Sequence, residues 1–190
     1  TYDGKFYCAP KDFSTLQLII NKDLWSAAGL TDSDIPKTWD QLEAVSKKLT
    51  ADGHVGLGIS GEYARVGSFM VQAGGNLMND DSTKATANSD ANVKALDFVK
   101  QMLNAGDLKY AKDLGAGWGG EAFGKGLAAM TIEGNWITGA MKSDYPNIKY
   151  QVAELPSGPA GAGTLQFTNC WGIAADSPNQ AAALKLVEQL

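Results

Sequence analysis

The sequence has little of what metal, thiol or phosphate chemistry requires. It contains one histidine, His54, and two cysteines, Cys8 and Cys170, which are too few and too dispersed to predict a zinc or Cys–His site. A single arginine, Arg65, stands among the 16 basic residues, and the net charge is −5, which argues against a surface that follows nucleic-acid phosphates. We therefore expect no metal, no cofactor and no nucleic-acid partner.

Long apolar runs are also missing, and the signals for nucleotide binding are weak. No apolar run approaches the roughly 20 residues that a membrane-spanning helix needs. The chain has neither a GxxxxGK(S/T) phosphate loop nor a GxSxG nucleophile elbow. The glycine-rich stretch GAGWGG at 115–120 has the spacing GxGxxG, but the bulky Trp118 inside it would obstruct a pyrophosphate. We therefore give nucleotide-dependent chemistry little weight.

The size and the ends of the chain suggest a segment of a longer protein. Its 190 residues, 44% hydrophobic and 19% charged, are enough for one ordinary domain or for a large domain with a piece of another. The chain starts at Thr1 without an initiator Met or a basic-then-apolar leader, so we expect any targeting signal outside it. Ser177 and Pro178 suit the start of a helix, and this helix runs to Leu190 without a Gly or Asn stop.

Helical and strand patterns alternate along the chain, which predicts an α/β fold. The expected strands are 16–20, 55–60, 128–133, 148–156 and 164–175. The expected helices are 21–29, 37–49, 64–75, 89–106, a short one near 120–126, 137–143 and 177–190.

Two helices carry specific expectations. In the helix 37–49, Thr38 and Gln41 stand at capping-box spacing, and Trp39 in the first turn is expected to pack in the core, as is Trp25. The helix 89–106 should end at Gly106. Its apolar positions on one face are Val93, Leu96, Val99 and Leu103.

One aromatic residue follows a strand at a sharp turn. In AAMTIEGNW, residues 128–136, Met130 and Ile132 alternate with two polar residues, and the strand then breaks at Gly134. Trp136 therefore sits at a strand-to-helix elbow, where open α/β sheets keep their ligand crevices. A tryptophan after a strand is also common in cores, so from the residues alone both a core role and a ligand role stay open.

Seven stretches occur in one fixed order along the whole chain. They are GKFYCAP, INKDLWSAAGL, PKTWDQLEAVSKKL, a GG after a helix, ALDFVKQML, AFGKGLAAMTIEGNW and GIAADSPNQAAALKLVEQL. In this order the chain resembles the carbohydrate-binding proteins of bacterial ABC importers, the maltodextrin-binding protein class. It departs from the family pattern YNKDLF at Ile20 and Trp25, and it has Ser14 at the anionic hinge position, which leaves the exact sugar open.

The resemblance implies a type II periplasmic-binding-protein fold, a clamp of two lobes that closes on its ligand by a hinge. Family proteins are nearly twice this length. Residues 17–149 would form the second lobe, a mixed sheet flanked by helices. Residues 1–16 would lead into the first hinge crossing, and residues 150–190 would form the second crossing with a partial return of strands and a helix into the first lobe.

The resemblance also implies what the protein does and where. It would bind a mono- or oligosaccharide in the cleft between the lobes and deliver it to the permease subunits of an ABC importer. It would not be an enzyme and would need no cofactor. It would be exported to the periplasm or the cell exterior, and it would touch the membrane only through a lipid anchor outside this segment.

The expected ligand groups follow from the chemistry of sugars. A sugar ring offers an apolar face, which a flat aromatic side chain covers, and a rim of hydroxyls, which bond carboxylates strongly. Trp136 matches the family's platform position, and GEYAR at 61–65 matches the segment that brings a carboxylate and an aromatic to the cleft. The resemblance therefore implies a site made of Trp136, Glu62 as hydroxyl acceptor, Tyr63 as a second stacking face, Trp118, and Asp12 and Ser14 from the other side.

The same residues also fit simpler roles. Glu62 and Arg65 fit an i,i+3 surface pair at a helix start, and for Arg65 we prefer this interpretation. Asp12 and Ser14 fit turn-formers after Pro10. No role is assigned to Trp171.

Two other function classes remain open. A glycoside hydrolase would need two carboxylates on either side of a bond, and Glu62 and Glu133 are the acidic residues near the proposed platform. A stand-alone sugar-binding module of the cell surface would use the same aromatic residues without an importer.

The two cysteines lie in strands that the resemblance places side by side in the first lobe. Cys8 is in GKFYCAP and Cys170 is in QFTNCWGIAA. Export would permit a disulfide between them. Strand neighbours need not be in register, so two free buried cysteines remain the alternative.

Overall fold

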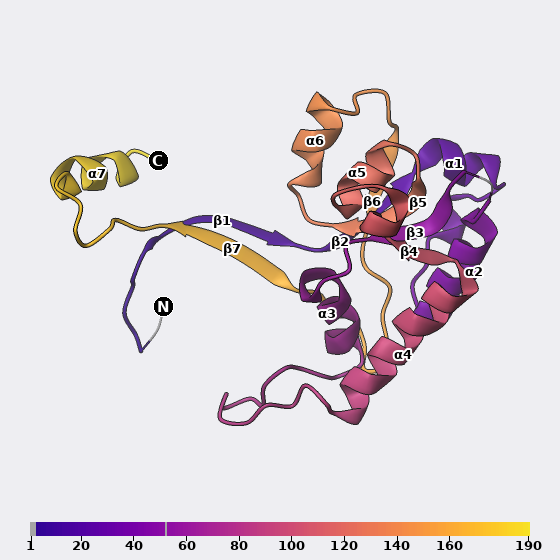
Figure 1. Ribbon diagram of the computed structural model, residues 1–190, viewed down its shortest axis with the longest axis horizontal. Helices are drawn as coiled ribbons and strands as arrows, with labels where there is room; N and C mark the ends of the chain where they lie inside the picture. The colour runs from indigo at the N-terminus through magenta and orange to yellow at the C-terminus, as the bar shows by residue number, and fades with distance from the viewer. Residues whose placement is uncertain (1–2, 52) are drawn as a thin grey trace. The chain divides into compact units, whose positions relative to one another are not determined.

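The computed structural model describes residues 3–51 and 53–190 (Figure 1). Its contacts divide the chain into two compact units. We call Thr15–Leu165 the main unit, and we call the described residues up to Ser14 together with Gln166–Leu190 the terminal unit.

The main unit is built on a five-stranded mixed sheet of order β4-β3-β5-β2-β6. Its strands are β2 (Gln17–Asn21), β3 (Val55–Ile59), β4 (Leu108–Tyr110), β5 (Ala128–Glu133) and β6 (Tyr150–Ala153). Strand β3 runs parallel to β4 and to β5, whereas β2 runs antiparallel to β5 and to β6. The carboxyl ends of β3, β4 and β5 therefore meet at one edge of the sheet.

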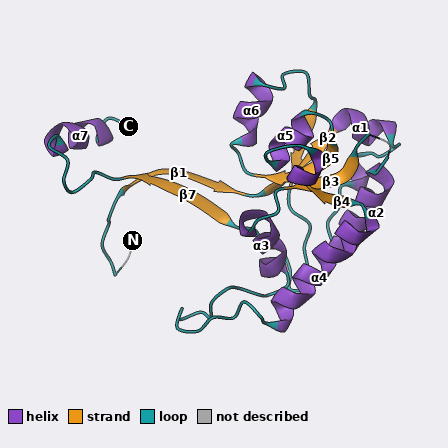
Figure 2. Cartoon of the chain, in the orientation of Figure 1, coloured by secondary structure: helices purple, strands orange, loops and turns teal. Residues whose placement is uncertain are grey.

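Helices cover both faces of this sheet (Figures 1 and 2). On one face α5 and α6 pack around Ile19 of β2, and on the other α2, α3 and α4 join through the rings of Trp39, Phe69 and Phe98. The α-helices of the main unit are α1 (Lys22–Ala27), α2 (Trp39–Leu49), α3 (Tyr63–Gln72), α4 (Asp90–Ala105), α5 (Gly119–Gly124) and α6 (Ile137–Ser143). Two short 3-10 helices are η1 (Asp32–Asp34) and η2 (Ala111–Leu114).

The start of α2 confirms the expected cap and the expected packing. Thr38 Oγ1 accepts the N–H of Gln41 at 3.3 Å, while the Gln41 side chain turns back to the N–H of Lys37 at 2.7 Å. Trp39 is buried and stacks on Phe98, with the ring centroids 4.6 Å apart. Trp25 is buried as well, so both tryptophans are packing residues.

The buried face expected for α4 is wrong by one residue. Val93 and Leu96 are 42% and 45% exposed, and Val99 alone of the four is buried. The side chain of Asn92 donates to the carbonyls of residues 76, 86 and 87, and this turns Asn92 toward the protein. The buried stripe is consequently Asn92, Ala95, Val99 and Met102. The helix ends as expected, with Gly106 in the left-handed region at φ 80°.

The expected lobe boundaries at 16/17 and 149/150 concern a longer protein and stay a prediction. Within this chain, β6 pairs with β2, and Thr164 Oγ1 accepts the N–H of Leu16 at 3.1 Å. These bonds tie the segment 150–165 to the main unit.

The terminal unit contains a two-stranded sheet and one helix. Strand β1 (Ala9–Thr15) pairs with β7 (Gln166–Trp171), and α7 is Gln180–Val187. The helix starts later than expected, after Asn179, because Ser177 Oγ accepts the N–H of Asn179 at 3.2 Å and closes a turn before the helix.

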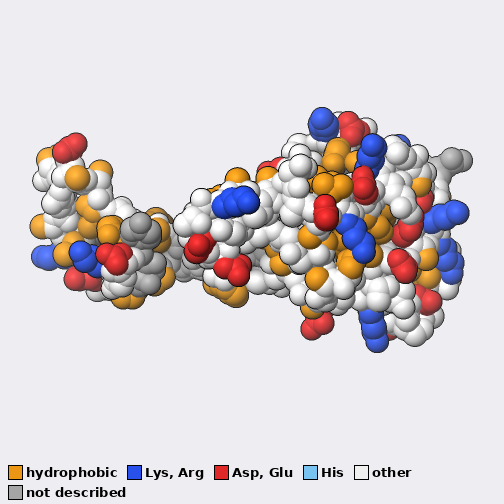
Figure 3. Space-filling view, turned by 90° about the horizontal axis from the view of Figure 1, so that it is seen from below, with side chains coloured by type: hydrophobic (Ala, Val, Ile, Leu, Met, Phe, Trp, Pro, Cys, Tyr) orange, Lys and Arg blue, Asp and Glu red, His pale blue; other side chains and the backbone are white. Residues whose placement is uncertain are grey.

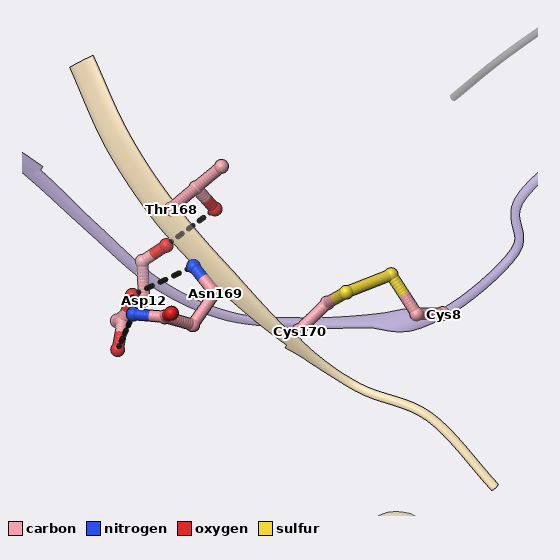
Figure 4. The surroundings of a disulfide bond; sticks show 5 residues. All are labelled: Cys8, Asp12, Thr168, Asn169 and Cys170. Atoms are coloured by element: carbon pink, nitrogen blue, oxygen red, sulfur yellow. Dashed lines mark hydrogen bonds between the residues drawn. A yellow bond between two sulfur atoms is a disulfide. The ribbon is translucent and has the colours of Figure 1, made fainter. Parts of the chain in front are cut away.

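A disulfide joins Cys170 of β7 to Cys8, the residue that precedes β1. Cys8 and Cys170 are bonded with their Cα atoms 5.7 Å apart, which settles the open alternative in favour of the bond (Figure 4). Beside it, Asp12 accepts the backbone N–H of Asn169 at 3.0 Å, and its own carbonyl accepts the hydroxyl of Thr168 at 2.8 Å.

In the described part of the chain, no helix has both the length and the apolar character needed to cross a membrane.

Candidate functional site

The site lies where β3, β4 and β5 end at the same edge of the sheet. The chain leaves β3 at Ser60, leaves β4 at Tyr110 and leaves β5 at Glu133, and each departure leads into a helix. Ligand crevices of open α/β sheets form at such an edge, because the loops after parallel strands converge there.

A buried ion pair occupies the base of the site. Glu133, the last residue of β5, has no exposed surface, and the side chain of Arg65 in the first turn of α3 is 10% exposed. Arg65 Nη2 donates to Glu133 Oε2, and Arg65 Nη1 donates to Glu62 Oε1 at 2.8 Å. Burial raises the pKa of the Glu133 carboxyl above its ordinary value, and the attraction of Arg65 opposes that rise.

Trp136 is held by the same pair. Its Nε1 donates to Glu133 Oε2 at 2.8 Å, and its ring centroid lies 5.3 Å from Arg65 Cζ, within cation–π range. The side chain is 36% exposed. A large flat ring is therefore fixed at its polar end while part of its surface faces solvent.

A cavity of about 330 Å³ opens beside Arg65. Trp118, Tyr110 and Gly61 form walls of it, and Glu62 and Lys112 are charged groups on its lining. Ser60 also lines it, and within the described residues Ser60 Oγ takes part in one hydrogen bond, as acceptor of the Gly119 N–H at 3.1 Å.

The glycine-rich stretch 115–120 is explained by this packing rather than by a nucleotide. A Cβ on Gly119 would lie 2.8 Å from Thr131 Oγ1 and 2.9 Å from Glu133 Oε1. Only a glycine lets the start of α5 approach the buried carboxyl so closely. Trp118, at the N-cap of α5, folds its ring over Gly120, where a Cβ would lie 2.1 Å from that ring.

The structure brings some of the expected ligand residues together. Glu62 and Trp118 line one cavity, and Trp136 contacts Arg65 of the same cavity. Tyr63 is 43% exposed, and its ring lies against Gly67 of its own helix. Their roles in binding stay predictions.

Asp12 and Ser14 belong to the terminal unit. Ser14 is buried, and the carboxylate of Asp12 bonds Lys11 and Asn169, which hold its pKa below the ordinary value. A role of either residue in a cleft stays a prediction.

The preferred interpretation of Arg65 as a member of a surface pair is wrong. The pair with Glu62 is present, but Arg65 is buried and also bonds Glu133. Strand β5 is covered on both faces, so that all six of its residues are buried, and its terminal carboxylate needs a cationic partner inside the protein. A signal was available in the sequence, namely an acidic residue at the end of an apolar strand in a chain with one arginine.

The charges of the site balance. Glu62 and Glu133 face Arg65 and Lys112. Acidic and basic side chains are likewise intermixed on the face of the main unit that Figure 3 draws. Across residues 3–51 and 53–190, no group of three or more His, Cys, Asp or Glu is arranged to hold a metal ion.

The sequence matches one family over its whole length. Residues 1–190 match the profile of the family described as bacterial extracellular solute-binding protein. A putative binding protein of Brucella abortus (strain 2308) is 30% identical, over 99% of this chain and 47% of the relative. The arabinooligosaccharide-binding protein of Bacillus subtilis (strain 168) is 25% identical, over 98% of this chain and 44% of the relative. The chain thus spans about half the length of these curated relatives.

Solved structures share the fold. An ABC substrate-binding protein from Listeria monocytogenes in complex with cycloalternan superposes with a TM-score of 0.86 and 31% identity, covering 98% of this chain and 48% of that one. An ABC transporter solute-binding protein from Thermotoga lettingae bound with α-D-tagatose gives a TM-score of 0.82 and 29% identity, over 99% and 50% of the two chains. The expected fold class, a type II α/β lobe with a mixed sheet flanked by helices, is confirmed.

Proposed function

The chain belongs to the bacterial extracellular solute-binding protein family, and from this premise we propose that its main unit contributes the platform of a carbohydrate site. The observation that carries the proposal is Trp136, a partly exposed ring whose orientation is fixed by Glu133 and Arg65. A fixed ring suits stacking on the apolar face of a sugar, because little rotamer freedom is lost on binding.

The charge of the site favours a neutral ligand. Arg65 is the one arginine of the chain, and it is already engaged by Glu133 and Glu62. An anionic ligand would therefore have to compete with two carboxylates for the guanidinium. The carboxylate of Glu62, with 54% of its side chain exposed, can instead accept hydroxyl hydrogens of a neutral sugar.

Delivery to an importer completes the proposal. The similar structures from Listeria monocytogenes and Thermotoga lettingae are named as ABC transporter binding proteins, so we assign the permease subunits of an ABC importer as partner. Export to the periplasm or cell exterior is supported by the family and by the disulfide, which persists in oxidising compartments. A lipid anchor outside this segment would hold the protein at the membrane. A surface module without an importer is the alternative, and co-purification with permease subunits would exclude it.

A glycoside hydrolase is disfavoured by the environment of Glu133. Glycoside hydrolysis needs two carboxyl groups that both reach the scissile bond. Glu133 is wholly buried and already accepts hydrogen bonds from Arg65 and Trp136. We therefore expect no turnover of chromogenic glycosides, and turnover that Glu62→Gln abolishes would contradict the binding function.

Replacing the platform should weaken sugar binding without unfolding the protein. Trp136→Ala, made in the protein expressed from its complete reading frame, should lose roughly 1–3 kcal/mol of binding free energy, because a stacking face is removed. A thermal-shift panel of glucose, maltose, lactose, arabinose, arabinooligosaccharides and tagatose would find the sugar, and calorimetry would measure the loss.

Leu96→Ala is the matched control for this substitution. Leu96 is a large apolar residue, 45% exposed, on α4 and outside the site. Its replacement should leave the affinity unchanged. If Trp136→Ala also leaves the affinity unchanged, Trp136 is not the platform.

A further inference from the structure

The cavity beside Arg65 is distinct from the exposed ring of Trp136. Trp136 is not among the described residues that line it, but Arg65 is near both. Arg65 lines the cavity, and its guanidinium carbon lies 5.3 Å from the Trp136 ring centroid. Arg65 therefore contacts one aromatic surface, Trp136, and shares the cavity with another, Trp118.

The cavity is small for a ligand site. Its volume is about 330 Å³, at the lower end of the roughly 300–1,000 Å³ of small-molecule pockets. A ligand longer than the cavity would have to continue outside it. Arg65 is the side chain that the cavity and the Trp136 platform share, so a ligand that continues past it reaches Trp136.

The walls of the cavity are preformed. Trp118 is half-buried, rests over Gly120 and packs against the cluster of Ile19, Phe123, Ile137 and Met141. Tyr110 lies against Gly61, where a Cβ would come within 3.0 Å of its ring. Burial raises the pKa of the Tyr110 phenol, so its hydroxyl stays neutral and able to donate as well as accept.

The polar groups on the lining suit hydroxyl groups. Glu62 offers carboxylate oxygens, Lys112 offers ammonium hydrogens, and Ser60 keeps a hydroxyl hydrogen to donate while it accepts from Gly119. Hydroxyls on a sugar ring both donate and accept, so they match a lining with both kinds of group. An apolar ligand would leave these groups unpaired.

We propose that this cavity is a second ring subsite, and that the ligand is an oligosaccharide with at least two rings. One ring stacks on Trp136, the chain passes Arg65, and the neighbouring ring enters the space between Trp118 and Tyr110. The inference rests on the proposed carbohydrate function, and it adds that the sugar ligand has at least two rings.

Ligand length is the direct test. Calorimetry on the protein from its complete reading frame would use two series: glucose, maltose and maltotriose, and arabinose, arabinobiose and arabinotriose. In the series that binds, the affinity should rise about tenfold from one ring to two, because the second ring gains its own stacking surface. Equal affinities for one and two rings would overturn the second subsite while leaving the carbohydrate function intact.

Substitutions of residues that line the cavity give a second test of the subsite. Trp118→Ala should bring the ratio of two-ring to one-ring affinity close to one. Lys112→Ala should also reduce that ratio. Because Lys112 is exposed, this second variant keeps the test valid if Trp118→Ala does not fold. Leu96→Ala should keep the ratio of the wild type. A ratio that neither lining substitution changes would overturn the subsite. Failure of every sugar in both series and in the panel to bind would instead overturn the carbohydrate function itself.

Discussion

Removal of the Cys8–Cys170 disulfide is expected to lower the free energy of unfolding by about 5 kcal/mol. The bond closes a loop with a sequence separation of 162, and in the chain-entropy model such a loop restricts the unfolded chain by about that amount. The terminal unit has little else to hold it, since it consists of two strands and one helix whose residues are largely exposed.

Urea unfolding would measure this loss in three samples. The oxidised protein should unfold at the highest urea concentration, and the reduced protein and Cys8→Ala/Cys170→Ala should unfold together at a lower one. Reductant should have no effect on the double variant, which serves as the control. Thiol titration of the denatured, unreduced protein should find almost no free thiol, and two reactive thiols per chain would contradict the bond.

Breaking the buried ion pair is expected to cost about 3–5 kcal/mol of stability. Arg65→Met removes the cation and leaves the carboxylate of Glu133 enclosed without a charge partner. The double variant Arg65→Met/Glu133→Gln should recover part of the loss, because no buried charge remains. Chemical denaturation of the two single variants and the double variant gives the coupling energy.

Two controls separate this effect from general damage. Glu62→Gln removes the half-exposed partner of Arg65 and should cost less than about 1 kcal/mol. An equal loss in Glu62→Gln and Arg65→Met would show that burial at Glu133 is not the cause.

The loss in Arg65→Met should also depend on pH. Burial raises the pKa of Glu133, and the variant lacks the cation that opposes this rise. A carboxyl whose pKa is higher in the folded than in the unfolded protein favours folding below its ordinary pKa and loses that contribution as the pH rises. Arg65→Met should therefore be less destabilised at pH 5 than at pH 8. A loss independent of pH would show that the Glu133 charge does not cause it.

The parts of the fold that the sequence predicted are those set by local signals. The cap at Thr38 and the stop at Gly106 depend on neighbouring residues alone, and both are where the pattern indicates. The face of α4 depends on a side chain of Asn92 that bonds distant carbonyls, which no periodicity reveals. Likewise, the partner of Glu133 stands 68 positions away in the sequence, and only the pairing of β3 with β5 brings it near.

Part of the candidate site could likewise be predicted from local signals. An elbow after β5 placed Trp136 at the edge where ligand crevices form, and parallel strands then bring Glu62 and Trp118 to the same edge. The residues that fix the ring are Glu133 and Arg65. From the sequence alone, Glu133 is considered only as a hydrolase carboxylate and Arg65 only as a member of a surface pair, because their mutual bond joins positions 68 apart.

The disulfide makes a covalent ring of the polypeptide from Cys8 to Cys170, and the main unit lies entirely within that ring. A protease that cuts one peptide bond anywhere inside the ring therefore opens it without dividing the molecule. On a gel run without reductant the cut protein migrates as one species, and two fragments separate only after reduction. A gel run without reductant would therefore not reveal a single proteolytic cut in the main unit.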